Sequence, residues 1–151
     1  MEKKTVLPMT VIKYSMETSL RTFHQDIEGI PLEIEEKVRE LELETTGPHT
    51  WVYFGADGNI DKPFVLDITI PVKEAKGDSG KFRFEQLPNF ECIVTEHKGA
   101  WSDLGRTYEQ FVPEVLKSGN QMSGFSREVY HLVDLENQEN CVTEIQIGIS
   151  E

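Results

Sequence analysis

The sequence matches itself at one fixed offset of 77 positions (124 − 47 = 77), and this internal repeat limits the folds that the chain can adopt. The matched pairs are Thr18 and Thr95, Val38 and Val115, Gly47 and Gly124, Tyr53 and Tyr130, Asp57 and Asp134, Val65 and Val142, Ile68 and Ile145, and Ile70 and Ile147. Each match is weak alone, but all of them share one offset without a gap. We therefore expect two copies of one structural unit that share a core.

Each copy contains an amphipathic helical pattern. In the second copy, large apolar residues recur at spacings of three and four, which places them on one helix face. They are Trp101, Leu104, Tyr108, Phe111 and Val115. The pattern predicts a helix over 101–117 that is capped at Gly119, with a kink or break at Pro113. Subtracting the offset predicts a first helix over 31–42, with Pro31 in its first turn, where a missing N–H costs little.

Strand patterns surround both helices. Runs rich in β-branched and aromatic residues predict six strands, at 10–17, 51–56, 64–72, 89–98, 125–133 and 141–149. A polar linker at 74–80 divides repeat one, about 8–73, from repeat two, about 81–151, and a short edge strand is expected at 82–85. The order is βαββ twice. It predicts a single α+β domain, in which two main helices cover one face of a mainly antiparallel sheet.

Composition excludes several classes of function. The net charge of −12 and a pI near 4.8 disfavour binding to nucleic acid, because the surface repels phosphates. No apolar run approaches the roughly 20 residues that cross a bilayer, and the N-terminus lacks the features of a signal peptide. We expect a cytoplasmic protein without membrane or nucleic-acid partners.

The cysteines and histidines give no sign of a metal or redox centre. Cys92 and Cys141 lack metal or redox spacing and are expected to be buried free thiols. The four histidines form no close pair, so no metal and no cofactor are expected. His97, near Gly99 at a strand end, is interpreted as a turn histidine bonded to the backbone.

The second half carries a family resemblance. The segments H-K-G-A-W-x-x-L from His97, G-x-x-x-E-V-Y from Gly124 and T-E-I-Q-I-G-I from Thr143 resemble the GyrI-like small-molecule-binding domain. That domain is also the effector-binding part of AraC-type and multidrug-sensing transcription regulators of bacteria. The resemblance implies two pseudo-twofold βαββ (SHS2-type) units around a ligand groove. This sequence departs from the family at Gly148, where relatives often carry proline. Because the first strand is expected within ten residues of Met1, we expect a stand-alone member without a DNA-reading segment.

The resemblance also implies the centre of the site. The family's recurrent acid in its E-x-Y element maps to Glu128, with Tyr130 as its neighbour. Strand alternation points both side chains to one face. The 77-residue offset makes Trp51 and Tyr53 their repeat equivalents, and all four are expected to surround the groove. The alternatives are a core role for the aromatic residues and a solvent-facing position for Glu128.

Two residues of the second helix complete the predicted site. Trp101, at its start, and Tyr108, whose hydroxyl is expected at the groove edge, are candidates for ligand contact and equally for packing. The ligand is expected to be lipophilic and aromatic, neutral or cationic, because a carboxylate among aromatic rings suits such a molecule.

Three functions remain open. The first is a small-molecule-binding module. The second is a hydrolase of reactive aromatic molecules, with Glu128 as general base, Tyr130 as hydrogen-bond donor and Trp51 or Trp101 stacking on the substrate. The third, by analogy with the gyrase-inhibiting family member, is a protein-interaction module whose acidic surface mimics DNA.

Overall fold

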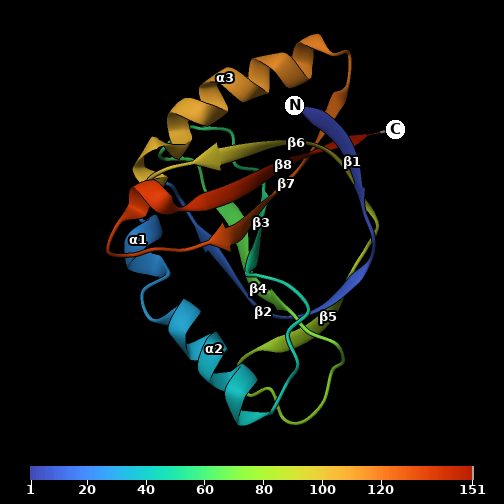
Figure 1. Ribbon diagram of the computed structural model, residues 1–151, viewed down its shortest axis with the longest axis vertical. Helices are drawn as coiled ribbons and strands as arrows, with labels where there is room; N and C mark the ends of the chain where they lie inside the picture. The colour runs from blue at the N-terminus through green and yellow to red at the C-terminus, as the bar shows by residue number, and fades with distance from the viewer. Residues whose placement is uncertain (151) are drawn as a thin grey trace.

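The computed structural model describes residues 1–150 as one eight-stranded antiparallel sheet with helices packed against it (Figure 1). The strands are β1 Glu2–Val6, β2 Met9–Thr18, β3 Thr50–Phe54, β4 Phe64–Pro71, β5 Arg83–Leu87, β6 Phe90–Lys98, β7 Gln121–Leu132 and β8 Val142–Ser150. The helices are α1 Phe23–Asp26, α2 Ile30–Glu40 and α3 Leu104–Lys117, with 3₁₀ turns at Trp101–Asp103 and Gln138–Asn140. The α+β fold predicted from the repeat is confirmed.

The order of the strands displays the duplication. The sheet runs β1-β6-β8-β7-β3-β4-β2-β5, so that strands at equal distances from its centre are equivalent in the two copies. At the centre, Trp51 of β3 lies opposite Glu128 of β7 in an antiparallel ladder. Their separation along the chain equals the repeat offset (128 − 51 = 77). The pseudo-twofold axis therefore passes through the Trp51–Glu128 pair.

The two edge strands tie the copies together. β1 precedes β2 in the chain but pairs with β6 of the second copy, and β5 precedes β6 but pairs with β2 of the first. The edge strand expected at 82–85 is part of β5. Sequence reasoning missed β1, because its mostly exposed residues have no buried face. Backbone pairing with β6 and the side-chain contacts of Lys4 and Thr5 hold it to the sheet.

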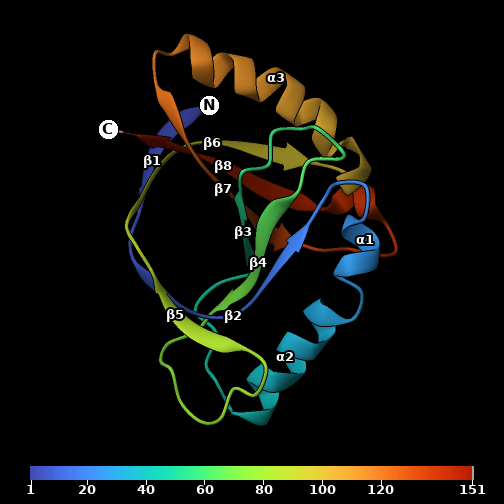
Figure 2. The same ribbon diagram turned by 180° about the vertical axis from the view of Figure 1, so that it is seen from behind.

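Both main helices pack on the same face of the sheet. α2 buries Ile34 and Val38, and α3 buries Phe111 and Val115, as the repeated stripes predict. The opposite face also contains buried residues, such as Val11 and Cys92, although no helix covers it. They are buried because the sheet curls around them, as the edge strands in Figures 1 and 2 show.

Of the kink or break predicted at Pro113, the break is wrong. α3 runs without interruption from Leu104 to Lys117, with Pro113 exposed on its outer side. Phe111 and Val115 anchor the helix in the core on either side of the proline, and this packing maintains the helix despite the missing donor. The helix ends at Ser118, and Gly119 follows with a left-handed φ of 85°, as expected of a C-terminal cap.

Three further features of residues 1–150 concern membrane-spanning helices, metal ligands and cysteines. Within that range, no helix is both long and apolar enough to cross a membrane. No group of three or more His, Cys, Asp or Glu side chains there is placed to hold a metal ion. Cys92 and Cys141 are free and buried, as predicted, and burial raises the pKa of the Cys92 thiol to about 11.

Candidate functional site

Glu128 is a buried acid at the centre of the sheet. It lies in the middle of β7, faces the helices and has only 5% of its surface exposed. Alternation along β3 and β7 places Trp51, Tyr53 and Tyr130 on the same face. The solvent-facing alternative for Glu128 is therefore excluded.

Three tyrosine hydroxyls surround the Glu128 carboxylate. Tyr53 and Tyr130 donate to Oε1 over 3.0 and 2.7 Å, and Tyr108 donates to Oε2 over 2.6 Å. We call Tyr53, Tyr108 and Tyr130 the tyrosine cluster. They come from β3, α3 and β7, so both copies of the repeat contribute to the site.

The Tyr53 and Tyr130 hydroxyls also lie within hydrogen-bonding distance of each other. Their oxygens are 3.2 Å apart, and either hydroxyl can be the donor. Because both also contact Glu128 Oε1, the two tyrosines and the acid form one hydrogen-bond network.

Burial and the acid together keep the tyrosines protonated. Burial is the main cause that raises the pKa of each member of the tyrosine cluster well above the usual value for tyrosine. The negative charge of Glu128 raises each pKa further, because a tyrosinate beside it would repel it. At neutral pH the cluster therefore supplies three neutral donors.

Both tryptophans contact the cluster edge-on through Tyr130. The Trp51 and Trp101 ring centroids lie 5.1 and 6.0 Å from that of Tyr130, with interplanar angles of 79° and 76°. Each indole N–H is anchored, in Trp51 to His49 over 3.4 Å and in Trp101 to Thr143 over 3.3 Å. The six residues singled out from the sequence thus form one contiguous group, although packing alone accounts for the position of the two tryptophans.

Sequence reasoning missed Phe23, which covers this group. Phe23, on the single-turn helix α1, stacks on Tyr53 with 6.4 Å between ring centroids and lies 6.1 Å from the Trp51 ring. The segment around it has no periodicity to mark it. One sequence signal was present. His24 is the repeat equivalent of Trp101 (101 − 77 = 24), so Phe23 lies next to the position that matches a predicted site residue.

His97 organises the start of α3. Its Nε2 lies 2.9 Å from the Ala100 carbonyl oxygen and its Nδ1 lies 2.7 Å from the Thr107 hydroxyl. The interpretation as a backbone-bonded turn histidine is confirmed. Thr107 lies on α3 next to Tyr108, so this contact joins the turn at His97 to the helix that carries the Tyr108 hydroxyl.

The charge at the centre has no ionic partner. Among residues 1–150, no lysine, arginine or histidine forms an ion pair with Glu128. Hydrogen bonds from neutral groups lower the cost of burying a carboxylate, but they leave its charge in place. An uncompensated anion among aromatic rings attracts a cation that can itself lose water readily.

No protein-family model and no curated protein matches the chain by sequence. Solved structures do match. EcmrR in its complex with DNA is 19% identical with a TM-score of 0.81, and the alignment covers 99% of this chain and 56% of that chain. The C-terminal domain of EcmrR alone is 17% identical, with a TM-score of 0.80 and coverage of 99% and 96%.

SAV2435 bound to tetraphenylphosphonium is 16% identical, with a TM-score of 0.71 and coverage of 99% and 93%. The chain has the GyrI-like fold. The same GyrI-like fold relates it to a hydrolase from Listeria innocua, at 12% identity, a TM-score of 0.60 and coverage of 99% and 92%. The chain thus spans about half of EcmrR and nearly all of the other two chains.

Proposed function

We propose that the protein binds a small, lipophilic, aromatic cation at Glu128, between the two copies of the repeat. The observation that carries the proposal is a buried carboxylate that three neutral hydroxyls hold and that has no ionic partner among residues 1–150. The SAV2435 structure, which has the same fold, contains the aromatic cation tetraphenylphosphonium. That likeness supports the chemical class of the ligand.

Each part of the site has a role in this proposal. Glu128 neutralises the cation, and the hydrogen bonds of the tyrosine cluster orient the carboxylate before the ligand arrives. Trp51 and Trp101 offer aromatic surface on which a flat ligand stacks. Binding energy then comes from apolar burial, while the acid selects for charge.

Entry requires the cover over the cluster to move. Phe23 is half-buried, and α1 has four residues, none of them buried. The stacking of Phe23 and two hydrogen bonds to Asp26 hold this single turn in place, and its local opening costs less than opening of the sheet. We place the entry route at α1, because displacing Phe23 uncovers the rings of Tyr53 and Trp51 together.

Calorimetric titration with tetraphenylphosphonium tests the proposal. Glu128→Gln should weaken its binding at least about tenfold, since a charge-assisted contact is replaced by a neutral one. Triphenylphosphine oxide, a neutral aromatic probe, should lose much less affinity. Glu36→Gln, at an exposed position on α2, removes the same charge and should leave both affinities unchanged. Equal losses for the cationic and neutral probes upon Glu128→Gln would refute the role of charge.

A hydrolase function is the second candidate, and the Listeria innocua neighbour supports it. In this reading Glu128 acts as general base and Tyr130 as hydrogen-bond donor to the substrate. Oε1 accepts from two hydroxyls and Oε2 from one, so an attacking water would donate to the lone pair of Oε2 that Tyr108 does not use. Loss of an electrophilic aromatic ester over time, abolished by Glu128→Gln, would favour this function, whereas stable complexes without product favour binding.

A further inference from the structure

The residue before Glu128 carries a second buried charge, on the other face of the sheet. Arg127 has 3% of its surface exposed, and its guanidinium carbon lies 4.1 Å from the centroid of the Phe90 ring. Its Nε and Nη1 atoms are buried without a hydrogen-bond partner. Burial lowers the pKa of Arg127 to about 10, so the side chain remains a cation at neutral pH.

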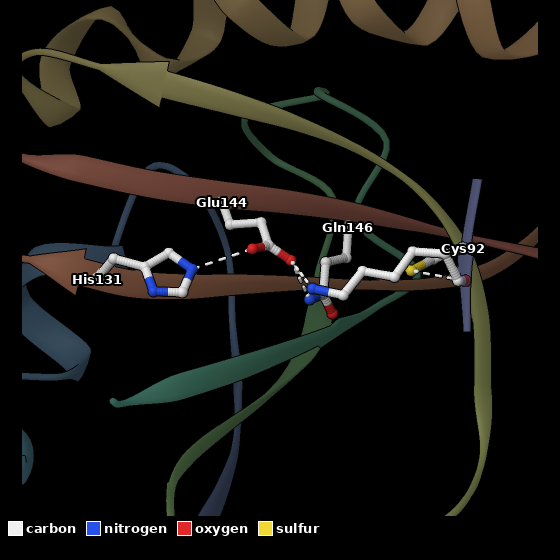
Figure 3. A network of polar contacts seen from close by, with 5 residues as sticks. Cys92, His131, Glu144 and Gln146 are labelled. Atoms are coloured by element: carbon white, nitrogen blue, oxygen red, sulfur yellow. Dashed lines mark hydrogen bonds and ion pairs between the residues drawn. The ribbon is translucent and has the colours of Figure 1, made fainter. Parts of the chain in front are cut away.

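Gln146 is the cross-strand partner of Arg127 and is also incompletely bonded. The two residues lie opposite each other on β7 and β8. The Gln146 amide nitrogen donates to Glu144 over 2.6 Å, as Figure 3 shows, while its Oε1 is buried and has no donor. Among residues 1–150, this strand pair thus presents two donor nitrogens and one acceptor oxygen without partners.

The acids on this face are committed elsewhere. Glu144 contacts Lys4 and His131, each over 3.0 Å (Figure 3 shows the His131 contact). Val52 of β3 lies between Asp67 of β4 and Arg127 of β7 in the sheet. Asp67 accepts a hydrogen bond from Ser15 and lies 3.5 Å from Lys13. Within residues 1–150, therefore, no carboxylate compensates Arg127.

The fold itself does not require these two side chains. Subtracting the offset places Thr50 at the position equivalent to Arg127 and Thr69 at that equivalent to Gln146 (127 − 77 = 50; 146 − 77 = 69). Both threonines are buried, so the first copy completes the same ladder with small neutral residues. A buried arginine without an ion pair is costly, and a requirement of the fold does not explain it.

We propose that Arg127 and Gln146 form a second small-molecule site, for a small carboxylate that also carries a hydroxyl group. The carboxylate accepts hydrogen bonds from the guanidinium, and the hydroxyl donates to Gln146 Oε1. Phe90 fixes the plane of the guanidinium by stacking on it. This site takes an anion, whereas the site at Glu128, behind the same strand, takes a cation.

Titration with glycolate at constant ionic strength tests the inference, with acetate and chloride as comparison anions. Glycolate supplies both groups, acetate lacks the hydroxyl and chloride lacks the bidentate geometry. We expect saturable binding of glycolate, about fivefold tighter than that of acetate, the difference that one hydrogen bond makes. Arg127→Met should weaken glycolate binding at least about tenfold. Lys13→Met removes a cation of the same face that is already ion-paired and should leave glycolate affinity unchanged.

The side-chain Nε–H resonance of Arg127 in the unaltered protein provides a readout that does not depend on a variant. Glycolate should shift this resonance along a saturable curve with the calorimetric dissociation constant. The proposal is overturned if the three anions act alike, if Arg127→Met binds glycolate as the unaltered protein does, or if the resonance does not respond. Those outcomes would assign the unused polar atoms to bound water.

Discussion

Arg127 and Glu128 are consecutive residues of β7, both buried, and no ion pair joins them, because strand alternation directs their side chains to opposite faces. Two opposite charges therefore lie on either side of one sheet at its pseudo-twofold axis. On the face that α2 and α3 cover, tyrosine hydroxyls surround the Glu128 carboxylate. On the opposite face, the Arg127 guanidinium stacks on Phe90.

The hydroxyl of Tyr108 should stabilise the unliganded protein. Tyr108→Phe removes the one hydrogen bond that Glu128 Oε2 accepts from residues 1–150, at a cost of about 1–3 kcal/mol in unfolding free energy. Urea denaturation measures the change. Tyr14→Phe, which removes a hydroxyl that forms no hydrogen bond with residues 1–150, should change stability by less than about 0.5 kcal/mol. Equal effects of the two substitutions would contradict the account.

Stability should fall steeply in alkali. The folded-state pKa of each tyrosine in the cluster is raised, so the folded protein retains these protons above the pKa of about 10 at which unfolded tyrosine loses them. The contribution is intact below pH 10 and is lost as the pH rises through the folded-state values. With three such groups the unfolding free energy should drop by up to about 4 kcal/mol per pH unit, a slope approached about one pH unit above the unfolded-state pKa, where unfolded tyrosine is almost fully ionised. Denaturation curves between pH 9 and 11 measure it. A flat profile in the unaltered protein would show that the hydroxyls are not buried beside an anion.

Phe23 should control the rate of ligand entry. Phe23→Ala removes the ring that lies on Tyr53 and Trp51, and tetraphenylphosphonium should then associate several-fold faster in stopped-flow fluorescence. Leu20→Ala, in the same connection but exposed, serves as the control and should leave the association rate unchanged. Unaltered association in Phe23→Ala would place the entry route elsewhere.

Gly148 should be required for packing on the face of the sheet opposite α2 and α3. A Cβ at this position would lie 2.5 Å from Ser123 Oγ, 2.7 Å from the Phe125 carbonyl oxygen and 2.8 Å from the Phe90 ring. Gly148→Ala should therefore cost about 1–3 kcal/mol in thermal or urea unfolding and should displace Phe90 from Arg127. Gly105→Ala, in α3 with open space around it, should instead stabilise the protein by about 0.5–1 kcal/mol. If both substitutions change stability in the same direction, the packing argument fails.

The sequence predicted those parts of the molecule that depend on periodicity. The repeat offset and strand alternation were enough to group Trp51, Tyr53, Glu128 and Tyr130, because cross-strand neighbours on one face must meet. The stripe that contains Tyr108 oriented α3 toward them. That these residues bind a ligand stays a prediction, since their mutual contacts also suit a packed core.

The remaining features depend on long-range geometry. The exchange of β1 between copies rests on backbone pairing of exposed residues, which leaves no pattern in the sequence. The burial of Arg127 follows from the curl of the sheet, and a charged residue in an alternating strand reads as solvent-facing. The break predicted at Pro113 was wrong because helix propensity is a local property, whereas tertiary packing anchors α3 at Phe111 and Val115.

The most direct measurement compares two probes of nearly the same size and shape and opposite charge on the unaltered protein. Calorimetry with tetraphenylphosphonium and tetraphenylborate holds aromatic surface nearly constant and reverses the sign of the central charge. If Glu128 selects the ligand, the cation should bind at least about 100-fold more tightly than the anion, a difference of about 2.7 kcal/mol. Equal affinities, or tighter binding of tetraphenylborate at the tyrosine cluster, would contradict the central claim.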